Sequence, residues 1–153
     1  MRKIAPYIDF DLMNSLQQKE TFYKLCEKHG VDYPGTIIYD QSMGLDFEMN
    51  FPYPVILKPS DSISYWEHPF ATQNKIYTIK DRKELEKVIR DIYGAGYIDK
   101  LIIQDMIPGN DEYMRVLTSY SDRNGKVKMM CLGHVLLEEH TPHGLGNHAV
   151  IIT

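Results

Sequence analysis

The sequence has few cysteines, no surplus of basic residues and no long hydrophobic run, and each absence excludes a class of protein. Two cysteines in 153 residues, without Cys-x-x-Cys spacing, do not make a disulfide scaffold, so we expect reduced core thiols. A net charge of −4 argues against a nucleic-acid partner, because nucleic-acid binders normally carry excess Lys and Arg. No apolar run approaches the roughly 20 residues of a membrane helix, and the first residues contain no secretory hydrophobic core. We therefore expect a cytoplasmic protein without a membrane partner.

The composition is that of an ordinary folded domain, with 43% hydrophobic and 25% charged residues. Helical and strand patterns alternate along the chain, and the second half contains an Asn124-Gly125 hairpin signal. The sequence therefore predicts an α+β fold with antiparallel strands in its second half. The expected helices span 15–29, with Ser15 as cap, and 81–93; the expected strands span 36–39, 55–57, 75–79, 101–103, 113–120, 126–137 and 149–153; a long polar loop is expected over 60–74.

Residues 51–60 contain the first candidate site. Val55, Ile56 and Leu57 form a short apolar run between two prolines, which predicts a strand buried on both faces. Lys58 ends this strand, and a hydroxyl-rich loop with Ser60 and Ser62 follows it. Together with Lys19, these groups could hold a polyphosphate, although the glycine pattern of a P-loop is absent. Taken alone, this stretch favours the simpler interpretation of Lys58 as a lysine whose ammonium reaches solvent at a strand end.

The second candidate site is the stretch 104–112, which leaves the apolar run 101–103 through Ile-Pro-Gly. A strand that ends in this way exposes main-chain groups that could read an adenine edge, and Asp111 or Glu112 could accept ribose hydroxyls. The alternative is a strand followed by an ordinary Pro-Gly turn.

The two stretches in this order resemble the ATP-grasp superfamily. The resemblance rests on Pro-Val-Ile-Leu-Lys-Pro-Ser, then Ile-Ile-Gln-Asp-Met-Ile-Pro-Gly, and on an entry segment from Lys19 through Val-Asp-Tyr-Pro-Gly-Thr at 31–36. Within that superfamily the chain looks most similar to carboxylate–amine ligases of the D-aspartate ligase and carbamoyl-phosphate synthase large-subunit type. The resemblance implies an ATP-grasp-like fold, with a small α+β subdomain followed by the first antiparallel strands of a second one.

The resemblance also implies a function and a set of contacts. It implies the ATP-binding part of a ligase that joins a carboxylate to an amine, or to a thiol, through an acylphosphate, with ATP and Mg²⁺ as cofactors. Arg115 could face the phosphates or a carboxylate, or be a surface arginine. The implied nucleotide contacts are Lys19, Lys58, Ser60 and Ser62 at the phosphates, Gln104, Asp105, Met106 and Ile107 at the adenine, and Asp111 or Glu112 at the ribose.

The chain departs from the superfamily's pattern in two respects. Its phosphate loop carries Ser62, Ser64 and two aromatic residues in place of glycines. The sequence also ends at Thr153, before any motif for magnesium ligands. We therefore expect a fragment of a longer ligase, inactive alone, with a lead-in at 1–14, a first subdomain at 15–103, and a hinge and incomplete second subdomain at 104–153. The alternative is a non-catalytic nucleotide-binding or structural fragment, and an exposed strand edge could support a homodimer.

Three histidines, His140, His143 and His148, lie close together near the end of the sequence. Their spacing matches none of the standard zinc motifs, so no metal ligand is predicted. Solvated loop histidines and a loop segment near a substrate both remain open.

Overall fold

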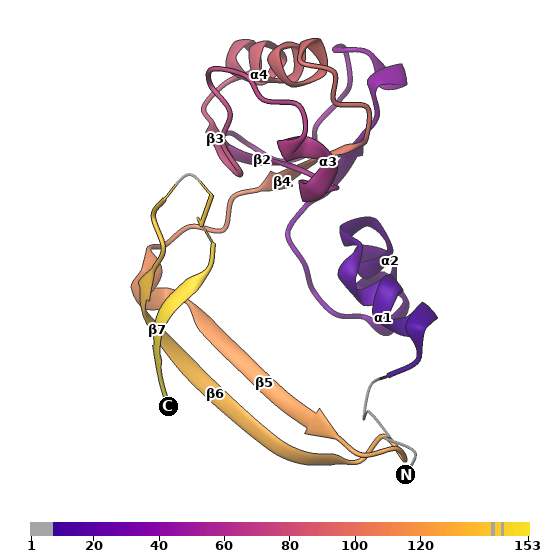
Figure 1. Cartoon of the computed structure of the whole chain (residues 1–153), viewed down its shortest axis with the longest axis vertical. Helices are drawn as coiled ribbons and strands as arrows, with labels where there is room; N and C mark the ends of the chain where they lie inside the picture. The colour runs from indigo at the N-terminus through magenta and orange to yellow at the C-terminus, as the bar shows by residue number, and fades with distance from the viewer. Residues whose placement is uncertain (1–7, 142, 145) are drawn as a thin grey trace. The chain divides into compact units, whose positions relative to one another are not determined.

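The computed structural model describes residues 8–141, 143–144 and 146–153, so residues 1–7 of the expected lead-in lie outside the described part. The chain divides into two compact units (Figure 1). Unit 1 holds the described residues of 1–73 and 77–106, and unit 2 holds residues 74–76 and the described residues of 107–153. Helices and antiparallel sheets occur together, which confirms the predicted α+β class.

Unit 1 begins with two helices where the sequence predicted one. Helix α1 spans Phe10–Gln17 and helix α2 spans Lys19–His29. The predicted start at Ser15 is wrong because Asp9 caps α1, its carboxylate accepting the N–H of Asp11 at 2.9 Å. Between the helices Gln18 is extended (φ −78°, ψ 122°), so Lys19 stands in the first turn of a new helix. Gly30 ends α2, as predicted, in the left-handed conformation.

A four-stranded antiparallel sheet, sheet A, forms the centre of unit 1. It consists of β1 (Thr36–Tyr39), β2 (Val55–Pro59), β3 (Tyr77–Ile79) and β4 (Leu101–Asp105), in the order β1-β4-β2-β3. Helix α4 (Arg82–Gly94), capped by Asp81 as predicted, packs its apolar stripe on one face. The buried core between them includes Val55, Leu57, Ile79, Leu85, Ile89, Ile92, Leu101 and Ile103.

The other face of sheet A carries the polar residues of interest. Because successive side chains on a strand alternate between faces, Ile56 and Lys58 point away from the core that holds Val55 and Leu57. The register places Gln104 opposite both Thr36 on β1 and Ile56 on β2. The strand order therefore places polar groups of β1, β2 and β4 on one face.

The expected loop at 60–74 contains a short helix, α3 (Ser62–Trp66), so that prediction is wrong. Asp61 caps this helix by accepting the N–H groups of Ile63 and Ser64. Tyr65 is wholly buried, and its hydroxyl lies 2.7 Å from that of Tyr77. The buried contact between Tyr65 and Tyr77 thus holds α3 in a stretch whose polar composition predicted a loop. A single 3₁₀ turn, η1 (Gln41–Met43), lies in the connection between β1 and β2.

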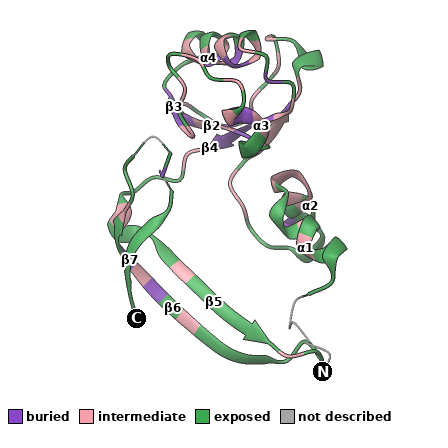
Figure 2. Cartoon of the chain, in the orientation of Figure 1, coloured by how far each residue is buried: buried purple, intermediate pink, exposed green. Residues whose placement is uncertain are grey.

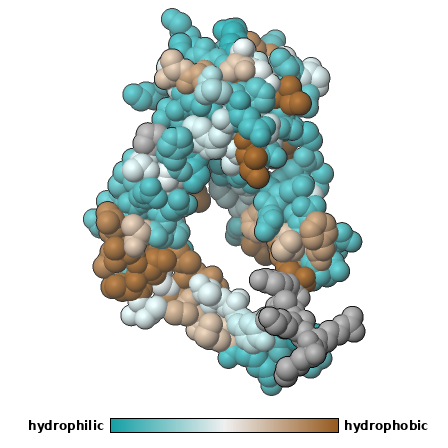
Figure 3. All heavy atoms as spheres, viewed as in Figure 1, coloured by the Kyte–Doolittle hydropathy of each residue, from teal (hydrophilic) through white to brown (hydrophobic). Residues whose placement is uncertain are grey.

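Unit 2 contains the 3₁₀ turn η2 (Asp111–Tyr113) and sheet B, which has three antiparallel strands. These are β5 (Arg115–Ser121), β6 (Val127–Glu138) and β7 (His148–Ile152), and the predicted hairpin joins β5 to β6. Many large apolar side chains of this sheet are exposed, including the cross-strand pair Leu117 and Leu132 at 58% and 61% (Figures 2 and 3). Of the large apolar side chains described in unit 2, Val135 alone is buried.

The helices of the described residues are all too short or too polar to cross a membrane. Cys26 is buried in α2, as predicted for a core thiol, whereas Cys131 on β6 is only partly buried. The two cysteines lie in different units.

Candidate functional site

Lys58 stands near the end of β2 on the face of sheet A opposite the core. It is partly buried, and its ammonium donates a hydrogen bond to the side-chain oxygen of Gln104 at 2.9 Å. Burial lowers the pKa of Lys58 below its ordinary value, and the neighbouring charge of Lys19 lowers it further. The site therefore brings together two like charges, and an anion bound between them would relieve their repulsion.

Lys19 reaches the same strand end from α2. Its ammonium lies 3.4 Å from the main-chain oxygens of both Pro59 and Ser60, the two residues that follow Lys58. Lys19 and Pro59 are 40 positions apart in the sequence, so tertiary packing is what joins them. The two lysines expected at a polyphosphate are thus neighbours in unit 1.

A cleft of about 360 Å³ lies beside Lys19. Ser60 and Asp61 line it from the end of β2, and Lys100 lines it from the loop before β4. Lys100 pairs with Glu20 at 2.8 Å, and this hydrogen bond is the main cause of the lowered pKa of the Glu20 carboxyl. The ion pair ties the first turn of α2 to unit 1's sheet and so holds the helix that carries Lys19.

Ser60 is also held by a tyrosine. Its hydroxyl lies 3.5 Å from that of Tyr97, which accepts the N–H of Asp61 at 3.3 Å and donates to the carbonyl of Lys100 at 3.0 Å. Tyr97 is buried. Hydrogen bonds to the hydroxyl of the buried Tyr97 therefore hold the turn that follows Lys58.

The other residues implied by the resemblance are distributed over the two units. In unit 1, Ser62 is the exposed first residue of α3, and Asp105 and Met106 are partly exposed at and after the end of β4. In unit 2, Ile107 is 71% exposed, and Arg115 donates to the carbonyls of Glu112 and Met114. Asp111 lies 3.1 Å from the ring of His140. Their nucleotide contacts stay predictions.

Two histidines of unit 2 lie beside carboxylates. His148 lies 3.2 Å from Glu138, and His140 lies beside Asp111. Residues 142 and 145 of this segment lie outside the described part. Among the residues that the structure describes, no three His, Cys, Asp or Glu side chains form a group that could hold a metal ion.

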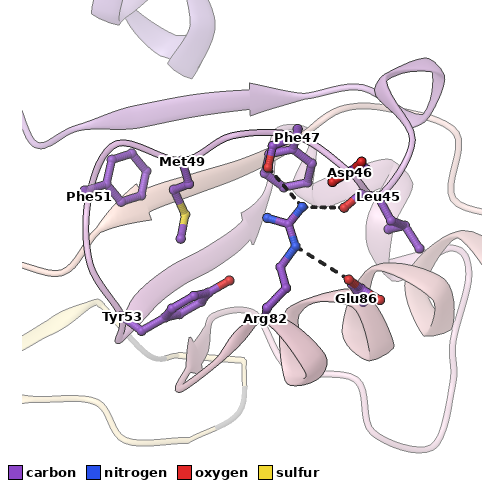
Figure 4. A pocket seen from close by; sticks show the side chains of 8 residues that line it. All are labelled: Leu45, Asp46, Phe47, Met49, Phe51, Tyr53, Arg82 and Glu86. Atoms are coloured by element: carbon purple, nitrogen blue, oxygen red, sulfur yellow. Dashed lines mark hydrogen bonds and ion pairs between the residues drawn. The ribbon is translucent and has the colours of Figure 1, made fainter.

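A larger cavity, about 650 Å³, opens elsewhere in unit 1 between the 45–53 segment and α4 (Figure 4). Arg82 projects into it, stacks 4.4 Å from the centre of the Phe47 ring, and donates to the carbonyls of Leu45 and Phe47. Glu86 pairs with the same guanidinium at 3.5 Å. Arg82 thereby fastens the 45–53 segment to α4, and none of the predicted site residues lines this cavity.

Reasoning from sequence missed four residues that surround the lysines. They are Tyr23 and Glu20 on α2, Thr36 on β1, and Lys100 before β4. Only one of them leaves a sequence signal, because Tyr23 stands four residues after Lys19 and thus on the same helix face. The other contacts depend on how the strands are ordered.

Comparison with known proteins adds an independent line of support. No family model matches the sequence. D-aspartate ligase of Enterococcus faecium (strain Aus0004) is 42% identical over 153 residues, covering 97% of this chain and 36% of the relative, so the chain spans about a third of that protein's length. A crystal structure of D-alanine–D-alanine ligase from Bacillus anthracis has a TM-score of 0.44 and 14% identity, covering 79% of this chain and 42% of that one. The 42% identity to D-aspartate ligase confirms the predicted resemblance to ligases of that type.

Proposed function

Because the chain is homologous to D-aspartate ligase over nearly all of its length, we propose that it is the ATP-binding part of an ATP-dependent carboxylate–amine ligase. The observation that carries this proposal is the pair of ammonium groups at the end of β2. Burial and the charge of Lys19 both lower the pKa of Lys58. The ammonium of Lys19 lies 3.4 Å from the main-chain oxygen of Pro59, the residue after Lys58. Two lysines held together in this way suit a ligand of high negative charge, such as a triphosphate.

In the proposed reaction the two lysines offset charge on the triphosphate. A carboxylate oxygen of the first substrate bonds to the γ-phosphorus, and the bond from that phosphorus to the β–γ bridging oxygen breaks, releasing ADP. The amine nitrogen of the second substrate then attacks the acyl carbon, phosphate leaves, and the nitrogen loses a proton. Positioning and charge neutralisation would supply most of the rate, with Lys19 and Lys58 as the contribution of this chain. A thiol as acceptor would follow the same scheme.

Among the described residues, no group of three or more His, Cys, Asp or Glu side chains could hold a metal ion. When bound, Mg²⁺ would offset further phosphate charge in such a ligase. The proposal therefore concerns nucleotide binding by unit 1.

Calorimetric titration of the chain with ATP tests the proposal. We expect saturable binding that Lys58→Ala weakens about ten- to hundredfold, since a hydrogen bond to a charged group contributes about 1.5–3 kcal/mol. Lys87→Ala is the matched control, because it removes an ammonium from the surface of α4, where Lys87 pairs with Asp91. Absence of ATP binding by the unmodified chain, or equal affinity of the Lys58→Ala chain, would contradict the proposal.

A further inference from the structure

The side chain of Gln104 makes three hydrogen bonds on the polar face of sheet A. Its oxygen accepts from Lys58 at 2.9 Å, and its nitrogen donates to the hydroxyls of Tyr23 and Thr36, both at 2.8 Å. Gln104 is only 8% exposed and is the one buried polar residue among the described side chains. A buried amide at the junction of α2, β1 and β2 is costly unless all of its groups are paired, and here both N–H donors are used.

Two independent contacts fix which way the amide points. A lysine ammonium has no acceptor, so the atom of Gln104 that faces Lys58 must be the oxygen. The hydroxyl of Thr36 donates its single hydrogen to the carbonyl of Pro34 at 2.7 Å, so toward Gln104 it can only accept. The atom facing Thr36 must then be the nitrogen. Both contacts require the same orientation.

We propose that Gln104, held by Tyr23 and Thr36, is a positioning residue that sets the location of the Lys58 ammonium for the phosphates of a nucleotide. This inference rests on the proposed function and assigns Gln104 a part in it. Tyr23 stands four residues after Lys19 on the same face of α2, so one helix presents Lys19 and also braces the partner of Lys58. The amide thus couples the two lysines.

The geometry also indicates which part of a nucleotide Gln104 affects. Its two N–H donors are occupied, and its main chain lies in β4 between β1 and β2, opposite Thr36 and Ile56. We expect its influence to pass through Lys58, to which its oxygen is bonded and whose ammonium would contact phosphate, rather than through the adenine contact that the resemblance implies for Gln104. The charged neighbour of Lys58 is Lys19 on α2. Gln104, which accepts from Lys58, and Tyr23, which accepts from Gln104, are both neutral. A neutral partner holds the ammonium without cancelling its charge.

The test compares Gln104→Met with Gln73→Met in the whole chain. Both variants exchange a glutamine for a methionine of similar size, but the side chain of Gln73 donates to the main-chain carbonyl of Tyr65 on α3, at 2.9 Å. Calorimetry with ATP and with adenosine gives two affinities for each variant. We expect Gln104→Met to weaken ATP binding about tenfold and to leave adenosine binding unchanged, and Tyr23→Phe to act in the same direction but less, since Thr36 still holds the amide.

Two results would overturn the inference. One is an unchanged affinity of the Gln104→Met chain for ATP, and the other is an equal loss for ATP and adenosine, which would place Gln104 at the base. If the unmodified chain binds no ATP, the proposed function fails, yet the positioning role is still measurable without ligand. NMR titration of the Lys58 side chain should then show a lower pKa in Gln104→Met than in Gln73→Met, because the buried ammonium has lost its acceptor; identical values would refute positioning.

Discussion

At the scale of single residues, the charged groups near the start of α2 are arranged by pairing as well as by sequence. Glu20 pairs with Lys100 at 2.8 Å and with Lys24 at 3.1 Å, and both partners lower the pKa of its carboxyl. The bond to Lys100 is the larger cause. It is also the contact that joins α2 to the segment before β4, so it holds Lys19 near Lys58.

We predict that Lys100→Met raises the pKa of Glu20 toward its ordinary value of 4.5. Because the folded-state pKa is lowered, the stabilisation by this carboxylate is present above the ordinary pKa and is lost as pH falls through the lowered one. In Lys100→Met this stabilisation is smaller, and its loss is complete at a higher pH because the folded-state pKa lies closer to the ordinary value. Carboxyl-carbon NMR of Glu20 between pH 2 and 7 measures the shift, a range of about five units around the ordinary carboxyl pKa.

Lys24→Met is the control for that measurement. Lys24 is the lesser cause of the shift and its side chain is 68% exposed, against 42% for Lys100. Its removal should raise the pKa of Glu20 by a smaller amount. Equal shifts in the two variants would contradict the assignment of Lys100 as the larger cause of the lowered pKa of Glu20.

At the scale of helices, two glycines at helix ends differ in backbone conformation. Gly30 ends α2 with φ of 64°, and its N–H bonds to the carbonyls of Cys26 and Glu27. Gly94 is the last residue of α4, has no positive φ, and would present a β-carbon to open space. The left-handed region penalises any side chain, whereas the helical region favours alanine over glycine.

The same substitution is therefore expected to act with opposite sign at the two ends. Gly30→Ala should lower the free energy of unfolding by about 1 kcal/mol, because alanine is strained at that φ. Gly94→Ala should raise it by about 0.5 kcal/mol, since alanine reduces the entropy of the unfolded chain. Urea denaturation of both variants measures these changes, and a shift of the same sign in both would contradict the assigned conformations.

At the scale of the whole molecule, burial is concentrated in unit 1. Its core gathers residues of all four strands of sheet A with α4 and buried tyrosines, whereas among the described large apolar residues of unit 2 only Val135 is buried. Exposed backbone hydrogen bonds with little apolar burial open at low free-energy cost. The two units should therefore differ in local stability.

Amide hydrogen exchange should separate the units. We expect the slowest amides in β2 and β4, which lie at the centre of sheet A, and exchange at least tenfold faster in β5 and β7, since about 1.4 kcal/mol of lower opening free energy gives that factor. Comparable protection of β4 and of the edge strands β5 and β7 would show that unit 2 is stabilised by contacts other than buried side chains.

Local patterns were enough to predict several elements correctly. The Asp81 cap and apolar stripe of α4, the Gly30 stop of α2, and the Asn124-Gly125 hairpin each depend on neighbours within a few residues. The failures have different causes. The start of α1 depends on the Asp9 cap, which is local, whereas the order of α3 depends on the burial of Tyr65 against Tyr77, 12 positions away, which no local period reveals.

Short-range patterns predicted that Lys58 follows an apolar strand and that Lys19 lies in a helix beside its apolar stripe, although Ile56 is only partly buried and the strand is therefore not buried on both faces. That the two ammonium groups are neighbours follows from tertiary packing alone, since Lys19 and the strand end are 40 positions apart in the sequence. Tertiary packing also decided that Gln104 lies between Thr36 and β2, because β4 is inserted between β1 and β2. Strand period specifies the face on which a side chain lies, but strand order specifies its neighbours.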